Sequence, residues 1–232
     1  MPERRTIIFY IACAILLTIS MAGSSMLRER QQARTLEQQA RDTPSEMMRA
    51  IKLYFPDEWA DIERHDPTTQ GARNEIAVGA VFMSAKLRHL ADAPDSALLD
   101  IIRNEMTLTR HLQQENIEHC AEFIVAGPAS ARTYSTTSAA LLDKIAASAV
   151  IAAGRGIETP QPRSDDPEAN SRELSQAMRD RGVADHLVDN LGTPLLSPAE
   201  QCQAGLQLYE TLLALPAAKA ASLYATLKYT PT

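Results

Sequence analysis

The stretch DSALLDIIRNEMTLTRHLQQENIEHCAEFIVAG, residues 95–127, decides the fold. At about 100° per residue, its apolar side chains fall within one sector of about 180° on a helical wheel, and polar side chains fill the rest. The apolar set comprises Leu98, Ile101, Ile102, Met106, Leu108, Leu112, Ile117, Cys120, Phe123 and Ile124. Pro94 precedes the stretch and Gly127-Pro128 closes it, as is typical of the two ends of a helix. We therefore expect one long amphipathic helix that packs against other helices.

The composition of the 232-residue chain extends the helical interpretation to the rest of the sequence. Aromatic residues make up 5% of it, Ala and Leu are abundant, and β-branched residues form no alternating run, so we expect an all-α fold. The formal net charge is −6. Binding to nucleic acid requires clustered Lys and Arg against the phosphates, and this sequence has no such cluster. Nucleic acid is therefore excluded as an expected partner.

The N-terminal stretch TIIFYIACAILLTISMAG, residues 6–23, carries no charge and follows an arginine pair. We expect residues 1–26 to be a membrane anchor or a signal segment, since about 20 apolar residues span the hydrocarbon core. Residues 20–22, Ser-Met-Ala, fit a cleavage site, and the arginine pair partly fits a twin-arginine signal. Strong helix formers continue through residues 27–43, however, which favours an uncleaved membrane helix followed by a polar helical stalk.

The cysteines indicate the compartment better than the charges do, because arginines flank both ends of the apolar segment. Cys13 lies within that segment, which leaves Cys120 and Cys202 as an even pair in the rest of the chain. Both lie on apolar faces of expected helices, and we predict a disulfide between them, as in an oxidising compartment. The alternative is two free cysteines that fill the core of a cytosolic protein. We therefore expect a single-pass cell-membrane protein whose soluble domain is extracytoplasmic, or periplasmic in a bacterium.

Proline and glycine residues divide the soluble part into three regions. Residues 44–153 are predicted to form a central helical bundle that ends with an Ala-rich helix. The stretch GRGIETPQPRSDDP, residues 154–167, combines glycines with prolines and is predicted to be a linker. Residues 168–232 are predicted to form C-terminal helices that pack on the bundle. The expected architecture is thus an N-terminal membrane helix and polar stalk followed by a multi-helix bundle.

A ladder of His111, Glu115, His119 and Glu122 lies along the border of the apolar sector of the first helix. Histidine and carboxylate side chains four residues apart are able to share a metal ion such as zinc. The ladder lacks the Glu-x-x-His and His-Glu-x-x-His spacings of metal motifs, and no second helix offers a matching set. We therefore expect weak pairs between side chains four residues apart, with no metal and no cofactor, and keep a metal site as the alternative.

Three further stretches contain candidate functional residues. Residues 131–140 are rich in hydroxyl groups, but no nucleophile elbow frames Ser135 or Ser138, so we expect a loop and a helix N-cap there. Residues 154–156, Gly-Arg-Gly, lack the length and the Lys of a phosphate loop and are expected to end a helix. The methionine pair and the aromatic residues of 47–59 are expected to pack on the bundle, with a partner-binding surface as the alternative.

No catalytic constellation emerges from these patterns, so we name no catalytic residue and favour a non-enzymatic role. The leading hypothesis is a membrane-tethered extracytoplasmic protein that binds another protein, as an accessory or inhibitor of a cell-envelope process. One alternative is a metal-binding protein or metal-dependent enzyme that uses the ladder. Another is a small-molecule carrier with an apolar pocket between the Ala-rich helices.

Overall fold

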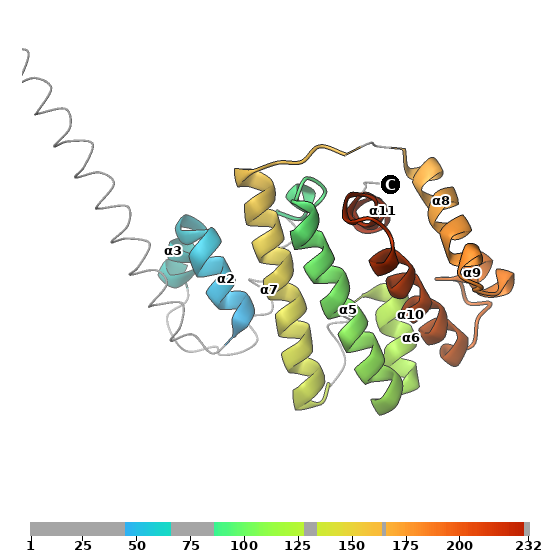
Figure 1. The fold of residues 1–232 in the computed structure, drawn as a ribbon. Coiled ribbons are helices and arrows are strands. Elements are labelled where there is room, and N and C mark those ends of the chain that lie inside the picture. Colours follow the sequence, from blue (N-terminus) through green and yellow to red (C-terminus); the bar gives the residue numbers. More distant parts are fainter. Residues whose placement is uncertain (1–44, 66–85, 128–133, 164–165, 230–232) are drawn as a thin grey trace, which may run out of the picture. The chain divides into compact units, whose positions relative to one another are not determined.

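The computed structural model describes residues 45–65, 86–127, 134–163 and 166–229, which form helices joined by turns and short connections (Figure 1). No strand occurs in these ranges. The elements are α2 (Glu46–Tyr54), α3 (Pro56–His65), the 3₁₀ helix η1 (Leu87–Leu90), α5 (Asp95–Glu115), α6 (Ile117–Ala126), α7 (Thr136–Glu158), α8 (Pro167–Asp180), α9 (Asp185–Asn190), α10 (Pro198–Ala214) and α11 (Ala217–Tyr229). The predicted membrane segment and stalk, residues 1–43, lie outside the described residues.

Helix α5 is the centre of the bundle. It packs against α7 on one side and against α10 and α11 on the other, and Figure 1 shows α7, α5 and α10 side by side. Helix α2 packs on α7, and α6 packs between α5 and α10. Helix α8 packs on α11 and α10. The all-α bundle expected from the sequence is therefore confirmed for the described residues.

The core forms where the apolar face of α5 meets the small residues of α7. The α5 side chains Leu98, Ile101, Ile102, Leu108 and Leu112 are all at most 1% exposed. Burial of each such side chain stabilises the fold by about 1.5–3 kcal/mol. The buried residues of α7 include Ala147, Ala149, Val150, Ala152 and Ala153. Because alanine is small, neighbouring helices approach α7 closely, which explains the Ala-rich composition of this helix.

The helix predicted over residues 95–126 is divided at Asn116, which corrects the expectation of one continuous helix. Asn116 adopts an extended conformation, with φ −160° and ψ 110°. Its side-chain oxygen accepts hydrogen bonds from the backbone N–H groups of Glu118, at 3.0 Å, and His119, at 3.2 Å. Asparagine competes well for backbone groups in this way and is a preferred N-cap. Residues before and after Asn116 therefore lie on two separate helices, α5 and α6, although their apolar positions fit one helical wheel.

Helix α7 extends to Glu158, beyond the end predicted at Ala153, so the expectation that residues 154–156 end a helix was wrong. Gly154 and Gly156 are buried inside the helix. A Cβ atom at Gly156 would lie 2.1 Å from the carbonyl oxygen of His89, and one at Gly154 would lie 2.6 Å from the Tyr54 ring. These glycines permit close packing of α7 against its neighbours. Glycine is unfavourable inside a helix and therefore predicts a helix end, but here the tertiary packing outweighs that local preference.

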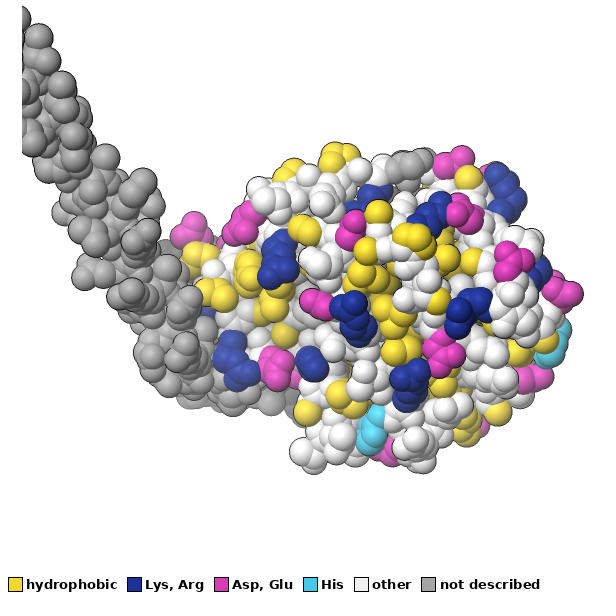
Figure 2. All heavy atoms as spheres, in the orientation of Figure 1, with side chains coloured by type: hydrophobic (Ala, Val, Ile, Leu, Met, Phe, Trp, Pro, Cys, Tyr) yellow, Lys and Arg dark blue, Asp and Glu magenta, His cyan; other side chains and the backbone are white. Residues whose placement is uncertain are grey.

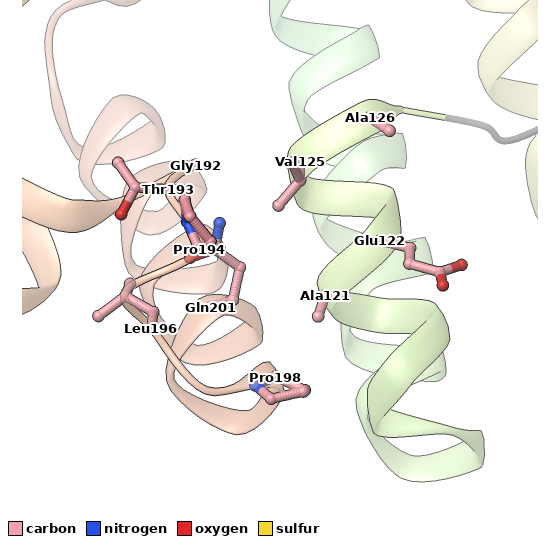
Figure 3. Close-up of a pocket in the computed structure, with 10 residues that line it drawn as sticks. All are labelled: Ala121, Glu122, Val125, Ala126, Gly192, Thr193, Pro194, Leu196, Pro198 and Gln201. Atoms are coloured by element: carbon pink, nitrogen blue, oxygen red, sulfur yellow. The ribbon is translucent and has the colours of Figure 1, made fainter.

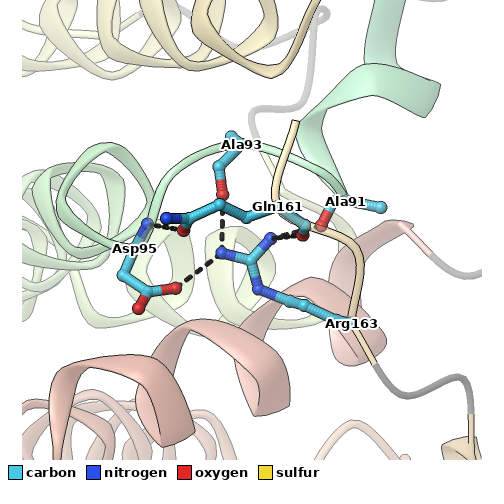
Figure 4. A network of polar contacts seen from close by, with 5 residues as sticks. All are labelled: Ala91, Ala93, Asp95, Gln161 and Arg163. Carbon is cyan, nitrogen blue, oxygen red and sulfur yellow. Dashed lines mark hydrogen bonds and ion pairs between the residues drawn. The ribbon is translucent and has the colours of Figure 1, made fainter. Parts of the chain in front are cut away.

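The connection between α7 and α8 is shorter than the predicted linker and is tied to the start of α5 (Figure 4). The Arg163 guanidinium donates to the carbonyl oxygens of Ala91, at 2.6 Å, and Ala93, at 2.5 Å. It also donates to the carboxylate of Asp95, at 2.7 Å. The side-chain oxygen of Gln161 accepts a hydrogen bond from the backbone N–H of Asp95, at 3.0 Å. The forked donor set of arginine thus fixes this segment to the bundle.

Helix α7 is also the one helix of the described residues whose length and hydropathy would suit a membrane crossing. It has 23 residues, and 44% of its most apolar window is buried inside the bundle. A helix in the centre of a bundle meets the same criteria, and α7 packs against α2, α5 and η1. Its composition is accounted for by these contacts.

Candidate functional site

Cys120 of α6 and Cys202 of α10 form a disulfide, which is the pair predicted from the sequence. The two Cα atoms lie 5.4 Å apart, and 82 positions separate the two residues in the chain. Both side chains are fully buried. The surrounding apolar cluster consists of Leu108, Leu112, Phe123 and Ile145. The bond joins α10 to the central part of the bundle, so a covalent link supports the packing of α6 on α10.

The predicted ladder is split by the break at Asn116. His111 and Glu115 lie on α5, whereas His119 and Glu122 lie on α6. The His111 Nε2 atom is 2.8 Å from a Glu115 carboxylate oxygen, so the first pair is in contact. The part of the chain that the structure describes contains no group of three or more His, Cys, Asp or Glu side chains arranged to hold a metal ion. The four side chains therefore do not converge on one point.

Glu115 joins the C-terminal end of α5 to the start of α7. Its carboxylate accepts hydrogen bonds from the hydroxyl groups of Ser138, at 2.6 Å, and Ser135, at 2.9 Å. These hydroxyl groups, with a smaller contribution from the charge of His111, lower the pKa of Glu115. Both serines donate to the carboxylate, whose lowered pKa makes it a weak base, and His111 contacts that carboxylate rather than a serine hydroxyl, so the contacts are not those of an activated serine. The arrangement is that of a helix cap, with Ser135 as the N-cap of α7.

The remaining predicted candidates take structural positions. The ring of His119 packs edge-on against Tyr134, with 5.8 Å between ring centroids. His186 pairs with Glu200 at 3.6 Å. In α2 and α3, the aromatic residues and the methionine pair of 47–59 pack on the core. The packing predicted for residues 47–59 is therefore confirmed, and the contacts described for these candidates are packing contacts and ion pairs.

Charge does not single out a surface on the face drawn in Figure 2, where acidic and basic side chains are interspersed among apolar ones. An apolar groove of about 340 Å³ is a better candidate site (Figure 3). It lies between α6 and the segment that joins α9 to α10, and it includes the first turn of α10. The lining residues are Ala121, Glu122, Val125 and Ala126 of α6, Gly192, Thr193, Pro194 and Leu196 of the segment, and Pro198 and Gln201 of α10.

The lining and the chain next to it expose large apolar side chains. Val125 is 54% exposed, and Leu195, which lies between two lining residues, is 77% exposed. In Figure 3, Ala121 and Val125 point toward the joining segment, whereas the carboxylate of Glu122 points away from it. The Thr193 hydroxyl is engaged locally, because it donates to the Asn190 carbonyl oxygen at 2.8 Å. The lining of the groove is therefore mostly apolar, with Glu122 and Gln201 as its exceptions besides Thr193.

The floor of this apolar groove contains a polar group without a partner. Gln201 is 3% exposed, and its amide nitrogen and oxygen are both buried. Neither atom has a hydrogen-bond partner among the described residues. A buried polar group in this state costs about 1–3 kcal/mol, and such groups are rare in folded proteins. Because this unpaired amide lines the groove, Gln201 is the residue of the groove that we consider first as a ligand contact.

Comparisons with known proteins identify no relative: no family model matches the chain, and no curated protein or solved structure matches it. The candidate site therefore depends on its geometry. Reasoning from the sequence missed Gln201, although one signal was present. Gln201 shares a face of α10 with Ala204, Gly205 and Leu208 at helical spacing, so a polar residue stands on a face that is otherwise apolar.

Proposed function

We propose that the protein is a membrane-tethered, extracytoplasmic helical module that binds another protein, as an accessory or inhibitor of a cell-envelope process. The docking surface in this proposal is the apolar groove between α6 and the segment that precedes α10. The single observation that carries it is the exposure of Val125 and Leu195 beside the apolar lining of the groove. Exposed apolar surface next to a groove is typical of protein–protein contacts.

Two observations support the cellular location in this proposal. The uncharged stretch of residues 6–23 has the composition of a membrane segment. The Cys120–Cys202 disulfide fits an oxidising compartment, since cytosolic thiols are kept reduced. Together they favour a soluble domain that is held at the outer side of the cell membrane, where a groove of this kind would meet envelope proteins.

Site-specific photocrosslinking in native membranes tests the proposal. A photoreactive amino acid at Leu195, which is 77% exposed beside the groove, should give a discrete adduct with a partner protein. The matched control carries the same amino acid at Ile157, an exposed apolar residue of α7 that does not line the groove. Val125→Arg should abolish the Leu195 adduct, because a charge on the rim opposes apolar docking. An identical adduct from Ile157, or none from Leu195, would contradict the proposal.

A further inference from the structure

We propose that the groove binds an extended peptide segment, and that the Gln201 side-chain amide pairs with the backbone N–H and C=O groups of one residue of that segment. The inference rests on the proposed protein-binding function and specifies the chemistry of the partner. It starts from the two amide atoms of Gln201, which are buried at the groove and have no hydrogen-bond partner among the described residues.

The chemistry of a carboxamide selects the group that satisfies it. Gln201 presents an N–H donor and a C=O acceptor side by side. In an extended chain, the N–H and C=O groups of one residue point to the same edge, and antiparallel strands exchange this pair of hydrogen bonds. A carboxylate ligand would supply acceptors alone, and a hydrocarbon ligand would supply neither partner. An extended backbone therefore matches both atoms of the Gln201 amide, and every residue of a peptide carries this pair of groups.

The lining of the groove determines which side chains the bound peptide carries. Ala121, Val125, Pro194 and Leu196 provide an apolar surface. The lining contains no Lys or Arg, and its one acidic residue, Glu122, directs its carboxylate away from the joining segment (Figure 3). A volume of about 340 Å³ accommodates side chains of the segment but not a folded domain. In peptide recognition, backbone hydrogen bonds commonly provide affinity and side-chain pockets provide specificity. The partner segment is therefore extended, uncharged and apolar.

Binding requires a local rearrangement, because the amide atoms of Gln201 are buried in the free chain. Figure 3 shows the Gln201 side chain extending toward Gly192 and Pro194, which belong to the segment that joins α9 to α10. Leu195 of this segment is 77% exposed, so its side chain contributes little buried apolar surface that would hold the segment in place. Movement of the segment would uncover the amide, and the two hydrogen bonds to the peptide would offset the cost of that movement.

A peptide selection on the full-length, disulfide-bonded chain tests the inference. The probe is a random dodecapeptide display library, and one selected peptide is then synthesised for measurement of its dissociation constant. The variants are Val125→Arg at the rim, Gln201→Met at the floor, and Gln207→Met as the matched control. Gln207 lies on the same helix and also has a buried amide oxygen without a partner, but it does not line the groove.

The expected result has three parts. Selected peptides are apolar and uncharged, and Val125→Arg abolishes their binding. Gln201→Met weakens binding about tenfold, which is the loss expected for a buried hydrogen-bonded pair, while Gln207→Met leaves it unchanged. N-methylation of the peptide at one backbone position weakens binding to the unmodified chain by a similar factor. It has no further effect in Gln201→Met, because the acceptor for that N–H group is already absent.

Three other results overturn the inference, and the third is distinguishable from the first two. Peptides whose binding depends on Val125 but is unaffected by Gln201→Met would refute the role of Gln201 and leave the protein-binding function intact. An additive effect of N-methylation in Gln201→Met would do the same. Failure to select any peptide whose binding depends on Val125 would overturn both the inference and the docking surface on which it rests.

Discussion

Cys120 and Cys202 join the two helices that border the groove, and each cysteine is the sequence neighbour of a lining residue. Cys120 precedes Ala121 in α6, and Cys202 follows Gln201 in α10. Both cysteines are fully buried, so the covalent link lies behind the surface that the groove presents. We therefore expect the position of the Gln201 amide relative to α6 to depend on the oxidation state of this pair.

Removal of the disulfide should lower the free energy of unfolding strongly. The bond closes a loop with a sequence separation of 82 residues, for which chain entropy gives an upper value of about 4–5 kcal/mol. We expect the double variant Cys120→Ala and Cys202→Ala to lose about 2–5 kcal/mol in urea unfolding. Thiol counting in a Cys13→Ala background should find no free thiol in denatured protein from its native compartment. Two reactive thiols would contradict the extracytoplasmic location.

Gly156 and Gly154 form a matched pair that tests the extension of α7. At Gly156 a Cβ atom would meet a backbone carbonyl oxygen, that of His89, which is fixed by its own element. At Gly154 it would meet the Tyr54 ring at 2.6 Å, which is able to rotate, and the Tyr54 Cβ at 2.9 Å, which moves only with α2. We expect Gly156→Ala to destabilise the fold by about 1–3 kcal/mol in urea unfolding. Gly154→Ala should cost less, because its closest contact is longer and involves a ring atom rather than a backbone atom. Equal, negligible effects would argue against the close packing of α7.

These residues also show how far the fold follows from the sequence. The apolar spacing of α5 and the stop at Gly127 are local signals, and the structure confirms both. The break at Asn116 was missed because one extended residue leaves the apolar pattern nearly unchanged. The glycines of α7 were read as a helix stop because their packing partners, His89 and Tyr54, are distant in the chain. Tertiary contacts thus determine the structure where the local sequence pattern is ambiguous, as at the C-terminal end of α7.

The Glu115 cap should make stability depend on pH. Hydroxyl groups of Ser138 and Ser135 hold the pKa of Glu115 below its usual value. A carboxylate with a lowered folded pKa stabilises the fold above its unfolded pKa of about 4.3, and this contribution is lost as the pH falls through the folded pKa. We expect Glu115→Gln to lose stability near pH 7 and to show a weaker decline than the parent chain between about pH 5 and pH 3. Ser138→Ala should reduce the same decline, and an unchanged pH profile in both variants would contradict the assignment.

The N-terminal segment should keep the protein in the membrane. If residues 6–23 form an uncleaved anchor, the native protein should resist alkaline carbonate extraction and retain its original N-terminus. A chain that lacks residues 1–26 serves as the control and should be extracted. N-terminal sequencing of the mature protein is the decisive measurement. A mature chain that begins at Gly23 would refute the anchor and leave an exported soluble protein.

The candidate groove was less accessible to sequence reasoning than the fold. Val125 and the lining residue Leu196 lie 71 positions apart, so the groove depends on the packing of α6 beside the segment before α10. The histidine ladder has a regular spacing that suggests a site, whereas Gln201 is a common residue at a common helical position. Its significance comes from burial and from the absence of a hydrogen-bond partner among the described residues, and neither property is visible in one sequence.

Gln201→Met should stabilise the free protein while it weakens peptide binding. Methionine has a similar length and an unbranched shape, and it removes two buried polar atoms that have no partner among the described residues. We expect the free energy of unfolding to rise by about 1 kcal/mol, measured by urea denaturation of the full-length chain without peptide. Val125→Arg provides the contrast, since Val125 is 54% exposed and its substitution should change stability little while it abolishes binding. A loss of stability in Gln201→Met would show that the amide is already hydrogen-bonded in the native protein, for example to a buried water molecule. The amide would then have no unsatisfied groups to offer a peptide, whereas a gain in stability at the expense of binding is the expected behaviour of a residue retained for recognition.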